Sequence, residues 1–246
     1  MFISLTNSTN NYLKKHPDCD DIWTSWQTAG RGQAGNSWES EQGKNVLMSL
    51  RLRKPQVAVE QAFLLQMAVS LGVQEVVANL LPNRQVTIKW PNDIYVDNKK
   101  ICGILIESTI ADGQLTEAIA GIGLNVNQTV WQSNAPNPVS LKQLTGMDYD
   151  LPTIYEALYK NINNKLSLLS DIETLKQQYR SVLYRFGQKS LYALREVSMT
   201  PSRILTDIPE NAFEATITDI TPQGQLVLET ATGSRMFHFK EIQFVL

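Results

Sequence analysis

Residues 30–38 read Gly-Arg-Gly-Gln-Ala-Gly-Asn-Ser-Trp, and this stretch decides between two kinds of fold. Glycine lacks a Cβ atom, so a glycine-rich loop can bring backbone N–H groups close to a phosphate. Arg31 adds a planar fork of donors that suits phosphate or carboxylate oxygens. The loop also matches the GxGxxG pattern of dinucleotide-binding folds. That pattern requires a strand before the loop, a helix after it and an acidic residue about 20 positions later.

The sequence on either side of this glycine loop argues against a dinucleotide fold. Residues 22–26 favour a strand, as that fold requires. Residues 36–43 are turn-like rather than helical, however, and residues 45–52 alternate as a second strand. Residues 51–54, where the acidic residue should stand, are mainly basic. The sequence therefore predicts a long loop between two strands. Such a loop is either a plain mobile hairpin loop or a phosphate- or ligand-binding loop, and its length favours the second.

The composition is typical of a globular protein with a core. The 246 residues suffice for one large domain, or for one domain with a smaller second one, and 43% of them are hydrophobic. The formal net charge of −2 argues against nucleic acid as the main partner. No apolar run is read as long enough to span a membrane, so no membrane partner is expected.

The cysteines and histidines indicate a compartment and exclude one kind of site. Cys19 and Cys102 lie far apart and form no CxxC motif, and no secretory signal is read, so a cytoplasmic location is expected. His16 and His238 stand in no ligand-like cluster. We therefore assign no residue to a metal site.

The hydrophobic pattern predicts an ordered series of elements. These are a strand at 2–5, a helix capped by Ser8 or Thr9, a helix at 55–81 interrupted near Gly72, strands across 86–127, and two helices across 153–185 with a break at 170–171 and a stop at Gly187. After Gly187 short alternating strands are separated by turns, which predicts a small β-barrel. The chain is thus expected to form two domains, residues 1–187 and residues 188–246.

A second segment with chemical character follows the strand that ends at Lys89. Residues 89–93 read Lys-Trp-Pro-Asn-Asp, and a turn at 97–100 leads into the apolar strand 101–107. This hairpin brings Lys89, Asp93 and Lys100 to one rim. Lys99 is interpreted as an exposed residue of the hairpin tip. Lys100 stands at the mouth of the strand, where Gly103 leaves room beside the backbone.

In this order the motifs resemble the catalytic domain of biotin protein ligases, the biotin–[acetyl-CoA carboxylase] ligases. The matching segments are residues 8–10, 27–38, 89–93, 100–105 and 121–125, the last reading Gly-Ile-Gly-Leu-Asn. The resemblance is strong over about residues 1–185. It implies an α+β fold of the class II aminoacyl-tRNA synthetase and biotin ligase type, with a mixed β-sheet flanked by helices. The β-rich tail agrees with the family's small SH3-like C-terminal domain.

The resemblance implies an ATP-dependent ligase that works in two steps. The carboxylate of biotin attacks the α-phosphate of ATP, which gives biotinyl-5′-AMP and pyrophosphate. A lysine on a biotin-acceptor domain of a carboxylase then attacks this mixed anhydride. Two anions must meet in the first step, so fixed cations and N–H groups can lower the barrier, and no enzyme nucleophile is required. Mg²⁺ is expected because it accompanies ATP.

The resemblance also implies roles for individual residues. The residues expected to bind biotin are Ser8, Thr9, Asn10, Gln27, Arg31, Gly32, Gln33 and Lys100, and those expected to bind the adenylate are Arg31, Trp38, Lys100 and Asn125. Lys100 would bridge the biotin carboxyl oxygen and the α-phosphate, with Arg31 as a second catalytic residue. Asp93 would position or deprotonate the incoming lysine, or would only cap the turn after Pro91. Trp38 would cover the apolar part of biotin or pack the folded loop.

The glycine loop departs from the family pattern, which usually reads Gly-Arg-Gly-Arg-Arg-Gly-Arg. Gln33, Ala34 and Asn36 stand where the later arginines are expected, and only Arg31 keeps its charge. We hypothesise that the loop holds biotinyl-5′-AMP with fewer ionic contacts, so that the intermediate escapes faster. Alternatively, Gln33 forms a hydrogen bond where arginine would.

Two other functions are weighed against a biotin ligase. A lipoate or octanoate ligase-type transferase on the same fold needs an Arg-Ser-Gly-Gly-Gly type loop and a later histidine, and neither is found. A non-catalytic biotin-binding module would not need Arg31 and Lys100. The chain starts close to the first catalytic strand and carries a net charge of −2, so no sequence-specific DNA binding is expected. Both a monomer and a homodimer remain open.

Overall fold

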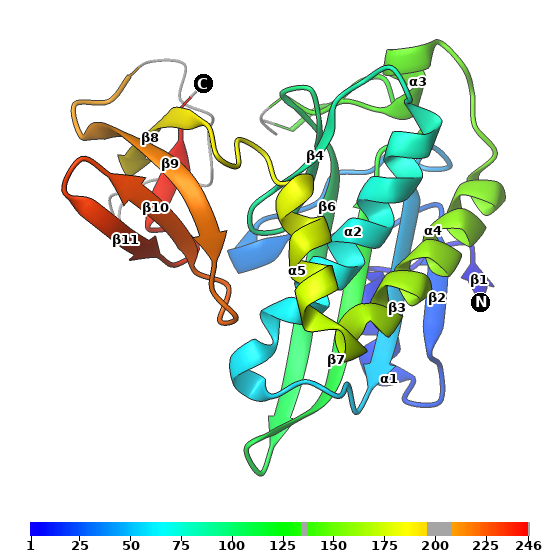
Figure 1. The fold of residues 1–246 in the computed structure, drawn as a ribbon. Coiled ribbons are helices and arrows are strands. Elements are labelled where there is room, and N and C mark those ends of the chain that lie inside the picture. The colour runs from blue at the N-terminus through cyan, green and yellow to red at the C-terminus, as the bar shows by residue number, and fades with distance from the viewer. Residues whose placement is uncertain (134–136, 196–207, 246) are drawn as a thin grey trace.

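The computed structural model describes residues 1–133, 137–195 and 208–245, which form two β-sheets with helices packed on the larger one (Figure 1). The larger sheet has seven strands in the order β1-β2-β3-β7-β6-β5-β4. Their bounds are β1 (Phe2–Ile3), β2 (Asp21–Thr24), β3 (Val46–Arg53), β4 (Val86–Lys89), β5 (Asp93–Val96), β6 (Lys99–Ala111) and β7 (Gln114–Leu124). β1 and β2 are parallel, and the other neighbours are antiparallel.

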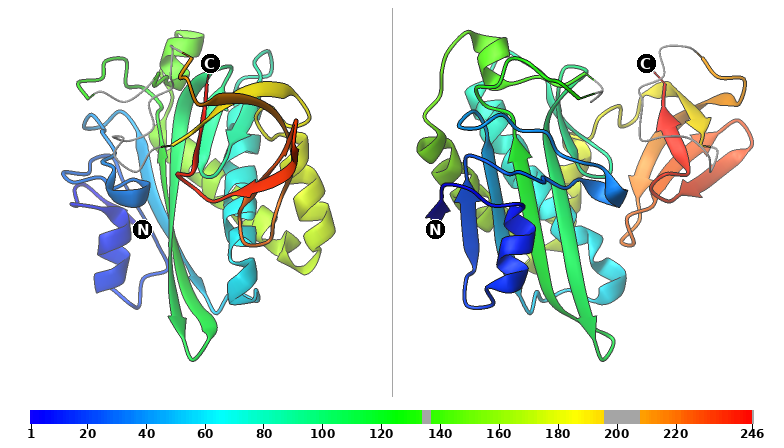
Figure 2. Two further views of the ribbon diagram at one scale, coloured as in Figure 1. Left: turned by 90° about the vertical axis from the view of Figure 1, so that its left-hand side faces the viewer. Right: turned by 180° about the vertical axis from the view of Figure 1, so that it is seen from behind.

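Helices cover both faces of this sheet. The helices are α1 (Thr9–Lys15), α2 (Phe63–Leu80), α3 (Leu141–Thr145), α4 (Leu151–Leu166) and α5 (Ile172–Ser181), with 3₁₀ turns η1 (Gln33–Gly35), η2 (Val59–Gln61) and η3 (Ser167–Ser170). α2, α4 and α5 lie together on one face (Figure 1). α1 and the glycine loop, residues 30–38, lie on the other face (Figure 2). The two faces of the larger sheet therefore differ: one packs against the helices of the hydrophobic core, and the other carries α1 and the glycine loop.

The alternation of side chains along β7 explains this division. Successive residues of a strand point to opposite faces. Ile122 belongs to the main hydrophobic core under α2, whereas Gly121 and Gly123 face α1 and the glycine loop. Ile104 on the neighbouring strand β6 is also part of that core. The apolar and glycine positions of one short strand thus build the core and leave space for the loop.

α2 differs from the expected helix in two respects, because it begins at Phe63 rather than at residue 55 and because Gly72 does not interrupt it. The helix at 55–81 was expected to break near Gly72, but α2 continues through Gly72. A Cβ atom on Gly72 would lie 2.6 Å from the Cα atom of Ile162, so this glycine lets α2 and α4 pack closely. By length and composition the helical segment Val59–Leu80 resembles a membrane-spanning helix, with a mean hydropathy of 1.4, as the core helix of a globular protein can. However, 67% of it is buried inside the structure.

The second sheet is antiparallel and follows α5. Its strands are β8 (Lys189–Leu194), β9 (Ala212–Ile220), β10 (Leu226–Thr230), β11 (Gly233–Phe237) and β12 (Ile242–Phe244), in the order β11-β10-β9-β8-β12. α5 ends at Ser181, so the expected helix stop at Gly187 is wrong, and Gly187 instead adopts φ +70° before β8. We keep the division into residues 1–187 and 188–246 as a proposal. One core cluster includes residues of both sheets.

The two sheets meet at Trp90, which follows β4. Its indole Nε1 donates a 2.9 Å hydrogen bond to the carbonyl oxygen of Gly224. Its ring packs edge-on against Phe239, with centroids 6.3 Å apart. The C-terminal sheet is therefore fixed beside the end of β4, at the rim of the larger sheet.

Candidate functional site

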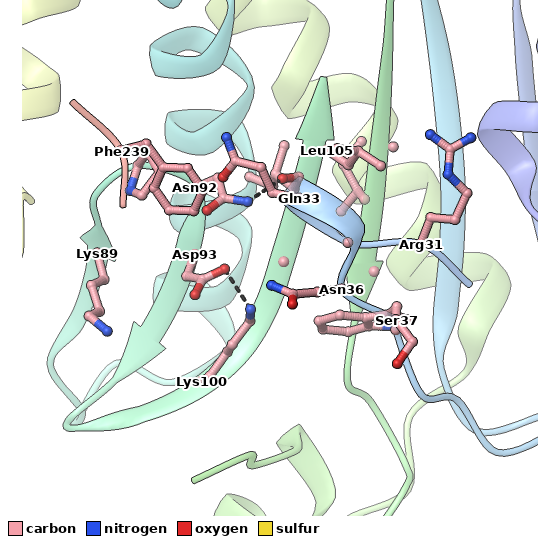
Figure 3. A pocket seen from close by; sticks show the side chains of 18 of the residues that line it. Arg31, Gln33, Asn36, Ser37, Lys89, Asn92, Asp93, Lys100, Leu105 and Phe239 are labelled. Carbon is pink, nitrogen blue, oxygen red and sulfur yellow. Dashed lines mark hydrogen bonds and ion pairs between the residues drawn. The ribbon is translucent and has the colours of Figure 1, made fainter. Parts of the chain in front are cut away.

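A cavity lies where α1, the glycine loop, strands β4 to β7 and the C-terminal sheet come together (Figure 3). The sequence-predicted site residues that line it are Ser8, Thr9, Asn10, Gln27, Arg31, Gly32, Gln33, Trp38, Asp93 and Lys100. The charged residues that line it are Arg31, Lys89, Asp93, Lys100, Arg195 and Lys240. Within the described ranges the lining thus holds several cations and one carboxylate, which favours an anionic ligand.

The strand register places four lining residues in one row across the sheet. Lys89 of β4 pairs with Asp93 of β5, Asp93 pairs with Gly103 of β6, and Gly103 pairs with Gly123 of β7. Residues directly opposite each other on neighbouring strands share a face. The row therefore runs from two glycines, through a carboxylate, to a lysine at the C-terminal sheet.

Trp38 lies on the two glycines of this row. A Cβ atom on Gly103 would come within 2.8 Å of the indole, and one on Gly123 within 2.5 Å. Real Cβ atoms do not approach other atoms so closely, so only glycine leaves room for the ring at these positions. The glycine loop itself is closed by backbone hydrogen bonds, from Trp38 N–H to the Gly30 oxygen at 2.9 Å and from Gly32 N–H to the Asn36 oxygen at 2.6 Å. The two strand glycines thus leave the space that the indole of Trp38, at the end of the loop, fills.

Asp93 and Lys100 form an ion pair beside this tryptophan. The Lys100 Nζ atom lies 2.6 Å from Asp93 Oδ1, and the side chains are 26% and 20% exposed (Figure 3). The ammonium also lies 5.5 Å from the centroid of the Trp38 ring. Asp93 and Trp38 thus orient the Lys100 ammonium, which still has N–H donors for an incoming anion.

Lys89 stands at the far end of the row, in a less polar setting. Its Nζ atom lies 3.2 Å from the Tyr95 hydroxyl and 5.2 Å from the ring centroid of Phe244. Burial lowers the pKa of Lys89 to about 8, and Lys100 and Arg185 add to this effect, which the negative charge of Asp93 partly opposes. The group therefore titrates close to neutral pH, unlike an exposed lysine.

The polar residues at the start of α1 form a connected cluster. Gln27 Oε1 accepts hydrogen bonds from Thr9 N–H at 2.7 Å and from the Thr9 hydroxyl at 3.1 Å. The Ser49 hydroxyl lies 2.7 Å from Thr9 Oγ1 and 2.6 Å from Asn10 Oδ1. A Cβ atom on Gly121 would come within 2.3 Å of Asn10 Oδ1. Ser49 and Gly121 thus hold two of the expected biotin-binding side chains in place.

Ser8 occupies the N-cap position of α1, but its side chain makes no capping hydrogen bond. The expectation that Ser8 or Thr9 caps the helix is therefore wrong. Thr9 is already the first residue of the helix, and its hydroxyl is bonded to Gln27. Ser8 is 3% exposed and lines the cavity, so its hydroxyl is placed for a ligand rather than for the helix.

Arg31 lines the cavity but does not point toward Lys100. Its guanidinium donates to Glu107 and to Asn11 Oδ1. Figure 3 shows the side chain directed away from Asp93 and Lys100. The structure therefore does not bring Arg31 together with Lys100, although the two were expected to share an anion.

Glu107 is a residue that the sequence did not single out. It binds Arg31, Lys14 and Asn10, so it connects the glycine loop to α1. Burial raises the pKa of Glu107, but hydrogen bonds from Lys14, Asn10 and Arg31 together outweigh burial and hold that pKa below its usual range. A lone carboxylate at the end of an apolar strand was the available signal. Its partners, however, are distant in sequence and cannot be inferred from it.

Gln33 and Asn125 lie in different settings. Gln33 lines the cavity, and its Oε1 atom is buried without a hydrogen-bond partner among the described residues, as is Trp38 Nε1. Buried polar atoms are normally paired, so these two are available to a ligand. Asn125 does not line the cavity, and its Nδ2 donates to the Val139 oxygen at 3.0 Å. The structure thus does not bring Asn125 to the other predicted residues.

The C-terminal sheet contributes lining residues that the sequence did not predict for the site. Phe239 and Phe244 reach the cavity from the last 10 residues of the described chain, beside Lys89 and Trp90. No local pattern in a β-rich tail indicates such contacts, because they depend on how the two sheets meet.

Comparison with known proteins places this geometry in a family. The family described as "Biotin/lipoate A/B protein ligase family" matches residues 2–125. The bifunctional ligase/repressor BirA of Bacillus subtilis is 30% identical over 254 residues, which cover 98% of this chain and 71% of that protein. The biotin–[acetyl-CoA-carboxylase] ligase of Mycobacterium tuberculosis is 29% identical over 206 residues, which cover 82% of this chain and 70% of that protein. The chain therefore belongs to the biotin/lipoate A/B protein ligase family.

Within that family it is a ligase of the biotin protein ligase type, the type that the sequence motifs resemble. The fold agrees. The biotin protein ligase of Aquifex aeolicus, solved in complex with biotin and ATP, superposes with a TM-score of 0.76 at 22% identity. The match covers 99% of this chain and 97% of that one. The mixed sheet flanked by helices and the C-terminal β domain are thus confirmed as the biotin ligase fold.

Proposed function

We propose that this chain forms biotinyl-5′-AMP from biotin and ATP. It then transfers the biotin to a lysine on the biotin-acceptor domain of a carboxylase, such as a biotin carboxyl carrier protein. One observation carries the proposal, which is the Asp93–Lys100 ion pair at the edge of the glycine-lined face under Trp38. That arrangement places the apolar surface of the Trp38 indole directly beside the Lys100 cation, which suits a ligand with an apolar chain that ends in a carboxylate. Biotin and ATP are the ligands of the similar Aquifex aeolicus structure.

We propose that the ring end of biotin binds at the start of α1. Ser8, Thr9, Asn10 and Gln27 supply hydroxyl and amide groups there, which suit a polar ring with both donors and acceptors. Trp38 lies on Gly103 and Gly123, and the apolar part of biotin then runs along the indole ring. This direction leads the carboxylate to Lys100.

We propose that Lys100 holds the biotin carboxylate against the α-phosphate, with the amide of Gln33 adding a contact and with Gly32 contributing its backbone N–H if that group exchanges the Asn36 oxygen for the ligand. A carboxylate oxygen attacks the α-phosphorus, and pyrophosphate leaves with the electron pair of the broken P–O bond. A fixed cation offsets the repulsion between the two anions. Arg31 can take part only if its guanidinium leaves Glu107 and binds the ligand. Asn125 can take part only if the nucleotide extends beyond the cavity to reach it.

We propose that Asp93 assists the second step. The amine of the acceptor lysine attacks the carbonyl carbon of biotinyl-5′-AMP, AMP leaves with the electron pair of the broken C–O bond, and the amine loses a proton. Asp93 is the carboxylate that lines the cavity within the described ranges. It can position the amine or accept its proton, provided that Lys100 shifts toward phosphate.

Mg²⁺ is proposed to bind with ATP rather than at a protein site made in advance. The described residues contain no group of three or more His, Cys, Asp or Glu side chains that could hold a metal. Mg²⁺ is commonly held by substrate phosphates and one or two carboxylates. Asp93 fits that limited role, and the metal would screen the phosphate charges.

The proposal predicts the product directly. Incubation of the protein with biotin, ATP, Mg²⁺ and a biotin-acceptor domain should give one biotinylated lysine, detected by mass spectrometry of the intact domain. The same domain with its target lysine replaced by alanine is the control. Modification with lipoate or octanoate in place of biotin would support the related transferase instead, and binding of biotin without modification would support a binding module.

The glycine loop predicts weak retention of the intermediate. Gln33 and Asn36 offer no charge to biotinyl-5′-AMP, so we expect it to dissociate faster than from a homologue that keeps the arginines. The variant Gln33→Arg should slow release by about 10- to 100-fold, since a charge-assisted hydrogen bond is worth about 1.5–3 kcal/mol. Trapping released intermediate in the absence of acceptor measures this rate. Equal release from the wild type, the variant and the homologue would contradict the hypothesis.

We do not propose the repressor function that the name of the Bacillus subtilis relative contains. The net charge of −2 gives little attraction for DNA, and a specific, salt-sensitive DNA complex would contradict this view. Cys19 and Cys102 are both free, which suits the proposed cytoplasmic location. The protein is proposed to act as a monomer or homodimer.

A further inference from the structure

We propose that Lys89 binds the β- and γ-phosphates of ATP and stabilises pyrophosphate as it leaves. This role rests on the proposed function, and neither the sequence motifs nor the comparisons assign it. It makes Lys89 a second catalytic cation, distinct from Lys100.

The position of Lys89 in the row across the sheet is the first support. In the proposed function Lys100 meets the α-phosphate; the structure pairs Lys100 with Asp93, and Asp93 with Lys89 on the next strand outward. Neighbouring strands lie about 4.8 Å apart, so Lys89 stands one strand further from the glycine face than Asp93 does. A leaving group must depart on the side opposite the attacking oxygen. A substrate that extends past Trp38 to Lys100 therefore directs pyrophosphate outward, toward Lys89.

The contacts of Lys89 are the second support. Among the residues that the structure describes, its ammonium forms no ion pair, and its polar partner is the Tyr95 hydroxyl at 3.2 Å. The rings of Tyr95 and Phe244 flank it, at 4.9 Å and 5.2 Å from their centroids. An ammonium has three donors, so donors are left for an anion in the cavity. Burial of a cation whose nearest carboxylate, Asp93, is already bound to Lys100 is unfavourable, and a phosphate would relieve that cost.

The charges around Lys89 are the third support. The charged and titratable groups that face it are Asp93, Tyr95, Lys100 and Arg185. Asp93 is already bound to Lys100, and Arg185 donates to the Val245 oxygen. On the opposite wall the glycine loop places neutral residues and Arg31, whose guanidinium is already bound to Glu107. In this chain the cations for the outer phosphates must therefore come largely from the strands and the C-terminal side.

The chemistry of the step suits a group that donates hydrogen bonds to pyrophosphate without transferring a proton to it. As the carboxylate oxygen bonds to the α-phosphorus, the bond from that phosphorus to the bridging oxygen breaks. The electron pair stays on that oxygen, so negative charge grows on pyrophosphate. Lys89 donates hydrogen bonds to those oxygens and keeps its proton, and electrostatic stabilisation of this kind is a major source of catalysis.

The experiment separates the two half-reactions, because biotinyl-5′-AMP contains no β- or γ-phosphate. In the variant Lys89→Met, biotin-dependent exchange of pyrophosphate into ATP should show a KM for pyrophosphate raised about 10- to 100-fold. Transfer of biotin from supplied biotinyl-5′-AMP to the acceptor domain should keep a rate within about twofold of the wild type. Lys89→Arg should restore part of the exchange. Lys99→Met removes an exposed lysine from the adjacent hairpin tip and is the matched control, with unchanged KM.

The pH dependence gives a second readout. The pKa of Lys89 lies at about 8, so its cation is present below that pH and is lost above it. The kcat/KM for pyrophosphate in the wild type should therefore fall as the pH rises through about 8, and Lys89→Arg should remove this fall.

Three outcomes would overturn the role of Lys89. These are an unchanged KM for pyrophosphate in Lys89→Met, a loss of transfer from supplied intermediate with exchange intact, and an equal loss of both half-reactions. The second would mark Lys89 as a base for the acceptor amine, and the third as a structural residue. Absence of exchange in the wild type would instead contradict the proposed function, so the two failures are distinguishable.

Discussion

Replacing Lys100 by alanine is expected to lower kcat/KM for biotin-dependent pyrophosphate exchange by about 100- to 1,000-fold, the usual effect of removing one preorganised donor. Lys100 is the cation fixed at the end of the glycine face, where it is held 2.6 Å from Asp93. Without it, no fixed cation stands between the biotin carboxylate and the α-phosphate to offset their mutual repulsion. Initial rates of label exchange at saturating biotin measure the effect.

The control for this variant must exclude unfolding. Both members of the ion pair are partly exposed, so the loss of Lys100 should change the free energy of unfolding by no more than about 1 kcal/mol. Lys99→Ala removes the neighbouring exposed lysine and should leave exchange unchanged. Exchange in Lys100→Ala within about threefold of the wild type, with a folded protein, would contradict the bridging role.

Replacing Gly123 by valine should raise the KM for biotin by about tenfold or more. A Cβ atom at this position would stand 2.5 Å from the indole of Trp38, and the added methyl groups would stand in the same space. The indole must move off the sheet and take the end of the glycine loop with it. Overpacking of this kind costs about 1–3 kcal/mol, and the loop should shift rather than β7, which is paired on both sides. Steady-state exchange at varied biotin measures the KM.

A double variant tests whether Trp38 mediates this effect. Trp38→Ala removes the ring that the valine displaces. If the ring is the cause, adding Gly123→Val to Trp38→Ala should raise the KM by much less than it does in the wild type. Equal fold-changes in both backgrounds would show that the valine acts on biotin or on the strand directly.

Much of the larger sheet was predictable from local patterns. Residues 45–52 alternate as a strand and form β3, and the run at 101–107 lies inside β6. The glycine loop was correctly separated from a dinucleotide fold, because no helix follows it. Such features depend on periodicity within a few residues, so the chain alone indicates them.

The errors arise where tertiary packing overrides local propensity. Gly72 looks like a helix break, but a glycine is also what a close helix–helix contact requires, and only the presence of Ile162 distinguishes the two. Ser8 looks like a capping residue, but it lines the cavity and makes no capping hydrogen bond. Local sequence does not record which partner such a residue meets.

The sequence predicted most of the residues of the candidate site, but few of the contacts between them. The motifs named the residues around Lys100 and the start of α1, and the fold brings most of these to one cavity. The pairing of Arg31 with Glu107 and the position of Asn125 outside the lining depend on contacts between distant segments. The contribution of Phe239 and Phe244 depends on how the C-terminal sheet meets β4. None of these follows from a motif.

The most direct test of the central claim is exchange of labelled pyrophosphate into ATP by the wild-type protein, with biotin present, omitted, or replaced by lipoate or octanoate. Exchange reports reversible formation of the acyl-adenylate and needs no acceptor protein. The account predicts exchange that requires biotin and is not supported by the other two acids. Exchange that is independent of biotin, or that responds to lipoate or octanoate instead, would contradict it.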